Sequence, residues 1–96
     1  MELEQLRTFL EVARTKSFTA AGHNLFVSHS TVSRAVSSLE AELGVSLLDR
    51  TNRVFGLTEA GKRLFDRAPE LLALADDIAD EVRKRSIERS NRMPLL

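Results

Sequence analysis

Segment 17–43 constrains the fold more than any other part of the chain. It contains two helical patterns, and each follows a serine, Ser17 or Ser28, whose hydroxyl can cap a helix N-terminus. Only two residues separate the end of the first pattern from Ser28, which predicts a tight turn. Gly44 follows the second pattern, at a position where helices commonly end. The segment therefore predicts two helices joined by a turn.

The second of these helices has two different faces. Its apolar residues recur at intervals of three and four and form one stripe, made of Val32, Ala35, Val36, Leu39 and Leu43. The opposite face is small, polar and basic, and carries Ser30, Ser33, Arg34 and Ser37. Hydroxyls bind phosphate oxygens or base edges, and arginine makes bidentate contacts with guanine or phosphate. Such a helix, second in a helix-turn-helix, is typical of one that lies in a DNA groove.

A further amphipathic helix is predicted ahead of this segment, over Leu3–Thr15. Its apolar residues also recur at three and four, which indicates one buried face. Gly22 stands in the middle of the next helix, where glycine costs roughly 1 kcal/mol relative to alanine. We expect the close approach of another helix at Gly22 to offset this cost.

After Gly44 the helical period stops, and two short apolar runs, 47–50 and 54–57, flank Thr51-Asn52-Arg53. The pattern predicts a hairpin, which after a helix-turn-helix forms a wing. Arg53 would lie at its tip, where a basic side chain can enter a narrow minor groove. Arg50 either contacts phosphate or pairs with a nearby acid.

A long last helix is predicted to begin after Thr58, which can cap it. Its apolar residues alternate in spacing between four and three, as in a coiled-coil seam: Leu64, Ala68, Leu71, Ala75, Ile78 and Val82. A helix of this length outruns a domain of about 60 residues. The seam therefore predicts a second copy of the chain as partner, and Pro69 predicts a kink near Leu64–Ala68.

The charge balance is neutral, with 14 basic and 14 acidic residues. Taken whole, it argues weakly against a nucleic-acid partner, because phosphate neutralisation requires lysine and arginine. The charges are sorted along the chain, however, and no acid lies between Glu11 and Glu40. A surface with sorted charges can bind DNA at zero net charge.

Other classes of protein fit the sequence poorly. The chain has no cysteine and two histidines, His23 and His29, so no metal or cofactor site is predicted. It contains no glycine-rich phosphate loop and no nucleophile–base set at a recognisable spacing, so an enzyme is not expected. No apolar stretch is long enough to cross a bilayer, and we expect a cytoplasmic protein without a membrane partner.

The order of short motifs resembles the N-terminal DNA-binding domain of the LysR-type transcriptional regulators. The resemblance runs from about Leu3 to Ala79 and rests on LEQLRTFLEVA, SFT, Val27-Ser28 with Ser33-Arg34, LEAELGVSLLDRT and LTEAG. It implies a mainly α fold, in which residues 1–58 form a winged helix-turn-helix of three helices and a two-stranded β wing. Residues 59–89 would form the linker and dimerisation helix and residues 90–96 a tail, without the effector-binding domain of the family.

The resemblance implies sequence-specific binding of double-stranded promoter DNA by a homodimer, with the recognition helix in the major groove and the wing in the minor groove. A small-molecule inducer would act only through the C-terminal domain, and the full-length protein could assemble further, into a tetramer. Together, the residues and the resemblance assign DNA contacts to Ser28, His29, Ser30, Thr31, Ser33, Arg34, Ser37, Arg50, Thr51 and Arg53.

Three residues depart from the usual pattern of the family. His29 stands where glutamine is usual, Ser30 where proline is usual, and Gly22 where alanine is usual. Because glutamine is a good adenine reader and histidine is less specific, we expect positions 29 and 30 to set a preference of their own. Two alternatives remain, namely a winged-helix module for protein–protein contact and a winged-helix regulator of another family with its own ligand pocket.

Overall fold

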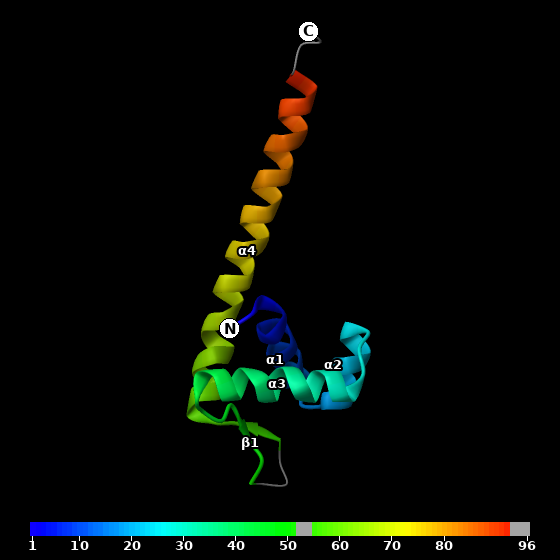
Figure 1. Ribbon diagram of the computed structural model, residues 1–96. Coiled ribbons are helices and arrows are strands. Elements are labelled where there is room, and N and C mark those ends of the chain that lie inside the picture. The colour runs from blue at the N-terminus through cyan, green and yellow to red at the C-terminus, as the bar shows by residue number, and fades with distance from the viewer. Residues whose placement is uncertain (52–54, 93–96) are drawn as a thin grey trace.

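The computed structural model describes the backbone of residues 1–51 and 55–92 and the side chains of residues 1–51 and 55–85. Within these ranges the elements are α1 (Leu3–Thr15), α2 (Phe18–Leu25), α3 (His29–Leu43), β1 (Leu48–Asp49), β2 (Gly56–Leu57) and α4 (Glu59–Arg92). Figure 1 shows α1, α2 and α3 gathered at one end, with the strands beneath α3 and α4 projecting away as a rod. The chain measures 66 × 25 × 20 Å. The predicted winged helix-turn-helix with a long last helix is confirmed.

The predicted helix caps are present. The Ser17 hydroxyl accepts a hydrogen bond from the Ala20 amide at 3.0 Å, and the Ser28 hydroxyl accepts one from the Thr31 amide at 3.1 Å. Gly44 ends α3 in the left-handed region, with φ of 72°. These local bonds satisfy amides and carbonyls that a helix end leaves unpaired, which is why they fix the ends of α2 and α3.

The core lies between the three short helices and the start of α4. The apolar stripes of α1 and α3 face each other there, as their spacing predicts. The buried apolar side chains are Leu6, Phe9, Val12, Ala21, Val32, Val36, Leu39, Leu47, Leu48, Ala68 and Leu72. Packing of α1 against α3 therefore holds the polar face of α3 outward.

Gly22 lies at the closest approach of α2 to the turn and α3. A Cβ placed there would lie 2.7 Å from the carbonyl oxygen of Val27 and 3.4 Å from Cγ2 of Val32. The expected close approach is confirmed, and it involves the backbone of the turn as well as α3.

The wing begins as a short antiparallel pair, in which Leu48 pairs with Leu57 and Asp49 with Gly56. The predicted hairpin is confirmed at its base. Asn52 and Arg53, which were predicted for its tip, lie outside the described residues.

Helix α4 is longer than predicted and continues through Pro69, ending at Arg92 rather than at residue 89. The helix is unbroken at Pro69, and Figure 1 shows one continuous rod, while the kink near Leu64–Ala68 stays a prediction. Proline removes one backbone hydrogen bond from a helix. Ala68 and Leu72, on the two sides of Pro69, are both buried in the core and keep the helix in place there. An ion pair of 3.1 Å between Arg7 of α1 and Asp76 adds a second tie.

Candidate nucleic-acid interface

The N-terminal half of α3 presents a continuous polar surface. On it, Ser28, His29, Ser30, Thr31, Arg34 and Ser37 are exposed, and Ser33 is half-buried. The start of α3 also presents backbone amides and the positive end of the helix dipole, which favour an anion. The structure thus brings together the predicted contacts of this helix on one side of the domain.

Ser28 is the N-cap residue of α3. Its Oγ accepts the Thr31 amide and lies 2.9 Å from the Thr31 hydroxyl. Both roles foreseen for Ser28 are compatible, because a capped helix N-terminus still attracts phosphate. The hydroxyls of Ser28 and Thr31 form one unit at the turn.

Arg34 is the one arginine or lysine in the first two turns of α3. No acid among the described residues lies within ion-pair distance of its guanidinium. An exposed guanidinium retains its five donors for a bidentate contact with guanine or phosphate. The geometry therefore leaves Arg34 free to meet an anionic or base-edge partner.

Arg50 is paired with an acid. Its NH2 group lies 3.2 Å from Oε1 of Glu40, and the Glu40 side chain is only 15% exposed. Of the two alternatives for Arg50, the structure shows the ion pair. The Arg50 side chain is still 54% exposed, so its remaining donors face solvent.

Glu40 joins α3 to the segment that leads into the wing. Its Oε2 accepts the backbone amides of Leu47 at 2.7 Å and Leu48 at 3.3 Å, and the Ser46 hydroxyl at 3.4 Å. Sequence reasoning missed this role. The available signal was a single acid that ends the acid-free interval, a few residues before the turn into the wing.

Replacing Glu40 with alanine should lower the free energy of unfolding by about 2 kcal/mol, because the buried Leu47 amide and the Leu48 amide both lose their acceptor. Urea unfolding measures this change. Glu40→Gln is the matched control: it keeps an acceptor and loses only an ion pair to a half-exposed arginine, which is worth less than about 1 kcal/mol. Equal losses in the two variants would show that the ion pair, and not the amide bonds, stabilises the junction.

Thr51 is also engaged within the wing. Its amide donates to Oδ1 of Asp49 at 3.1 Å and its hydroxyl donates to the same oxygen at 2.5 Å. The hydroxyl bond and then the amide bond lower the pKa of the Asp49 carboxyl from its ordinary value. An ionised carboxylate beside Thr51 disfavours a phosphate at that hydroxyl. Arg53, the predicted tip residue, lies outside the described residues.

The predicted seam on α4 divides into two parts. Ala68 is buried in the core of the domain, and Leu64 is partly buried and packs against that core. Ala75 is half-buried, while Leu71, Ile78 and Val82 are 40%, 52% and 63% exposed. Leu74, which the seam omitted, is 55% exposed beside them. The exposed stripe is therefore made of Leu71, Leu74, Ile78 and Val82, with the half-buried Ala75 between them.

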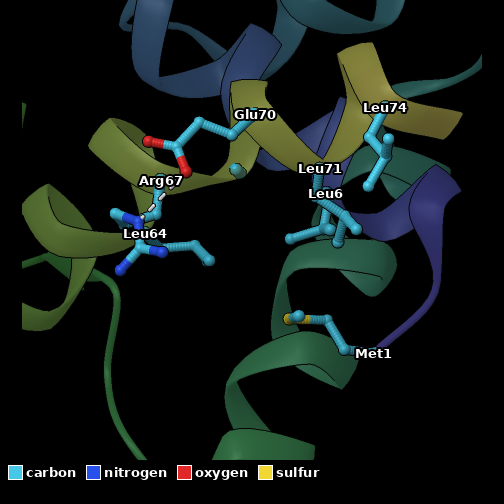
Figure 2. A pocket seen from close by; sticks show the side chains of 8 residues that line it. Met1, Leu6, Leu64, Arg67, Glu70, Leu71 and Leu74 are labelled. Atoms are coloured by element: carbon cyan, nitrogen blue, oxygen red, sulfur yellow. Dashed lines mark hydrogen bonds and ion pairs between the residues drawn. The ribbon is translucent and has the colours of Figure 1, made fainter. Parts of the chain in front are cut away.

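A shallow apolar groove of about 330 Å³ continues this exposed stripe onto the domain. Figure 2 shows Leu6, Leu71 and Leu74 on one side of it, and Arg67 paired with Glu70 at another. The nitrogen Nε of Arg67 lies 3.4 Å from Oε2 of Glu70. Apolar side chains that share one exposed face are typical of a protein–protein contact.

Within the part of the chain that the structure describes, no helix is both long enough and apolar enough to cross a membrane.

Comparison with known proteins gives a consistent result. A family model described as bacterial regulatory helix-turn-helix protein, lysR family, matches residues 3–62. An uncharacterized HTH-type transcriptional regulator of Azotobacter vinelandii is 37% identical over 99% of this chain and 66% of its own length. The HTH-type transcriptional regulator BudR of Raoultella terrigena is 43% identical over 79% of this chain and 26% of its own. The chain thus spans less than two thirds of the length of these relatives.

Solved structures are similar in fold as well. The protein chain in the crystal structure of a BenM_DBD/catB site 1 DNA complex has a TM-score of 0.83 and 34% identity, and covers 90% of this chain and 96% of its own. A CbnR_DBD-DNA complex has a TM-score of 0.82 and 38% identity, over 90% of this chain and 99% of that one. Both of these similar domains were crystallised with DNA.

Proposed function

The chain belongs to the lysR family of bacterial regulatory helix-turn-helix proteins, and we propose that it binds double-stranded promoter DNA as a homodimer and so regulates transcription. The observation that carries the proposal is the exposed polar face of α3, on which Arg34 has no acidic partner among the described residues, on a fold that matches DNA-bound domains. A helix of this kind fits the width of the major groove.

The position of these residues at the exposed start of α3 supports the following contacts. Arg34, Ser33 and His29 contact base edges, while Ser28 and Ser30 contact phosphates at the start of α3. Thr31 and Ser37 lie beside these groups and complete the surface.

The wing contributes a second set of contacts. Arg50 reaches a phosphate with the donors that Glu40 leaves free. Thr51 lies near the DNA backbone, while its hydroxyl stays bonded to Asp49 and does not take a phosphate itself. Arg53 enters the minor groove, where negative potential is concentrated.

The charge distribution supports this docking. No acid lies between Glu11 and Glu40, so α2 and the N-terminal half of α3 carry no carboxylate of their own to repel phosphate, although the net charge of the chain is zero. Exposed acids, among them Asp76, Asp77 and Asp80, lie on α4, which Figure 1 shows extending away from α3 and the wing. A dimer through the exposed stripe of α4 places two copies of α3 on two half-sites.

Selection of bound sequences from random duplex DNA tests the proposal. We expect an interrupted inverted repeat, because a two-fold dimer addresses two half-sites. We also expect the affinity to fall as salt rises, because phosphate contacts release counterions. A pool with no enriched sequence and no salt-dependent binding would favour the protein–protein module instead.

Arg34→Ala should weaken binding to the selected duplex by roughly 1–3 kcal/mol, the usual value of a good base contact. Fluorescence anisotropy at fixed salt, on the selected and on a random duplex, measures the change. Arg83→Ala is the control, because it removes the same charge from a position far along α4, where Arg83 lies beside Asp80. An equal loss on both duplexes would mean that Arg34 contacts phosphate only.

A further inference from the structure

Three aromatic rings lie in series at the start of α3. The centroid of the His29 imidazole lies 5.6 Å from that of Phe18, with 54° between the ring planes. The Phe18 ring in turn meets Phe55 edge to face, with centroids 6.2 Å apart and an interplanar angle of 71°. Aromatic pairs favour such tilted and edge-to-face arrangements at these separations. The series therefore runs from the segment entering β2, through the start of α2, to the first residue of α3.

The three rings differ in burial. Phe18 and Phe55 are half-buried and pack against the core, whereas His29 is exposed. Within residues 1–51 and 55–85, the imidazole makes no hydrogen bond. The imidazole thus contacts the Phe18 ring at a tilt, while the rest of the exposed side chain faces solvent.

Resting on the proposed function, we propose that Phe18 is a positioning residue for base recognition by His29. The Phe18 ring, braced by Phe55, restricts the imidazole to an orientation that presents its nitrogens to one base edge. A side chain ordered before binding loses less rotamer freedom when it docks, so its contact discriminates better between bases. The base preference of this protein at that position is then set by the pair of rings and not by His29 alone.

The geometry favours positioning over packing alone. A histidine with a free choice of rotamers could donate or accept at several base edges, and would discriminate poorly. Phe18 removes part of that choice, and it does so from α2, outside the recognition helix. Phe55 directly precedes β2. The same series of rings therefore connects the start of the second wing strand to His29, which we propose contacts the DNA base.

The test begins with duplex selection on the wild type and on His29→Ala. The base pair whose preference disappears in His29→Ala is the position that His29 recognises. Four duplexes that differ only at that base pair are then used in anisotropy titrations with wild type, Phe18→Leu, His29→Ala and the double variant. We expect Phe18→Leu to reduce the discrimination between the four bases by about threefold to tenfold. In the His29→Ala background, Phe18→Leu should leave the discrimination unchanged.

Two further variants serve as controls. Phe55→Leu, which removes the brace without removing the contacting ring, should change the preference in the same direction and by less, and it keeps the test valid should Phe18→Leu fold poorly. Phe65→Leu makes the same substitution on α4, where the ring is 37% exposed, and should leave the preference unchanged. Circular dichroism confirms that each variant is folded.

The outcomes separate the two proposals. A uniform loss of affinity for all four duplexes in Phe18→Leu, or a wild-type preference that His29→Ala does not alter, would overturn the positioning role while DNA binding stands. Wild-type protein that binds no duplex above background would overturn the proposed function, and the positioning role with it.

Discussion

Ile78→Lys should convert the proposed homodimer to monomer and weaken binding to a two-half-site duplex by more than about 100-fold. Ile78 is 52% exposed in the middle of the stripe formed by Leu71, Leu74, Ile78 and Val82. Figure 1 shows this part of α4 projecting beyond α1, α2 and α3. At a two-fold contact the substitution places an ammonium from each copy in the same apolar interface, where neither charge has a partner.

The size of the effect follows from the loss of linkage between half-sites. A second half-site bound within one dimer experiences an effective concentration near millimolar, so breaking the dimer forfeits a factor of 10² to 10⁴ in affinity. Binding to a single half-site should change little, because the face of α3 is untouched. Sedimentation velocity and anisotropy on one-site and two-site duplexes measure the two parts separately.

Ala73→Lys is the matched control, because Ala73 is exposed on the side of α4 away from the stripe and receives the same charge. Its dimer should sediment as the wild type does. If Ile78→Lys also sedimented as a dimer with circular dichroism unchanged, the exposed stripe would not be the dimer contact.

The elements of this fold were predictable because their signals are local. Ser17, Ser28 and Gly44 act on residues one turn away, and the spacing of apolar residues in α1 and α3 reports which face is buried. The polar face of α3, and with it Arg34, followed from the same periodicity.

Periodicity could not assign the faces of α4. Leu71 and Leu72 are adjacent apolar residues, and only packing against α1 decides that Leu72 is buried while Leu71 is exposed. In the same way Ala68 satisfies a coiled-coil pattern and a core pattern equally well. The seam drawn from sequence therefore mixed core residues with exposed ones and omitted Leu74.

The contacts around the recognition helix were hidden for a different reason. The Glu40–Arg50 pair joins residues ten apart, and the Phe18 ring meets rings at positions 29 and 55. The pairs with Arg50 and Phe55 form only when the wing folds back beside α3, and the Phe18–His29 pair forms only when α2 packs against the start of α3. For Arg50 the sequence was compatible with either a phosphate or an acidic side chain as partner. The tertiary structure places Glu40 within ion-pair distance of it.

Gly61→Ala should destabilise the domain by about 3 kcal/mol or more, although alanine is the better helix former by roughly 1 kcal/mol. Gly61 is buried in the first turn of α4, where its amide donates to the Thr58 hydroxyl at 3.0 Å. A Cβ there would lie 2.1 Å from the carbonyl oxygen of Leu47, a distance that no contact between these atoms allows.

The collision cannot be relieved cheaply, because the backbone of Leu47 is held on both sides. Its carbonyl accepts the Thr58 amide at 3.1 Å and its amide donates to Glu40 at 2.7 Å. A shift of Leu47 would therefore cost hydrogen bonds at the junction of α3, the wing and α4, and the steric term exceeds the gain in helix propensity. Thermal unfolding should show the midpoint falling by about 12–24 °C.

Gly44→Ala is the matched control, because it separates the cost of a steric collision from the cost of an unfavourable backbone conformation. No atom lies within 4 Å of a Cβ at Gly44, so its cost comes only from φ of 72° and should be about 1–2 kcal/mol. We therefore expect Gly61→Ala to be the less stable of the two, and its DNA affinity at low temperature to fall with the folded fraction. A Gly61→Ala protein as stable as the wild type would mean that the junction moves freely, and that α4 is not fixed relative to the recognition helix through Leu47.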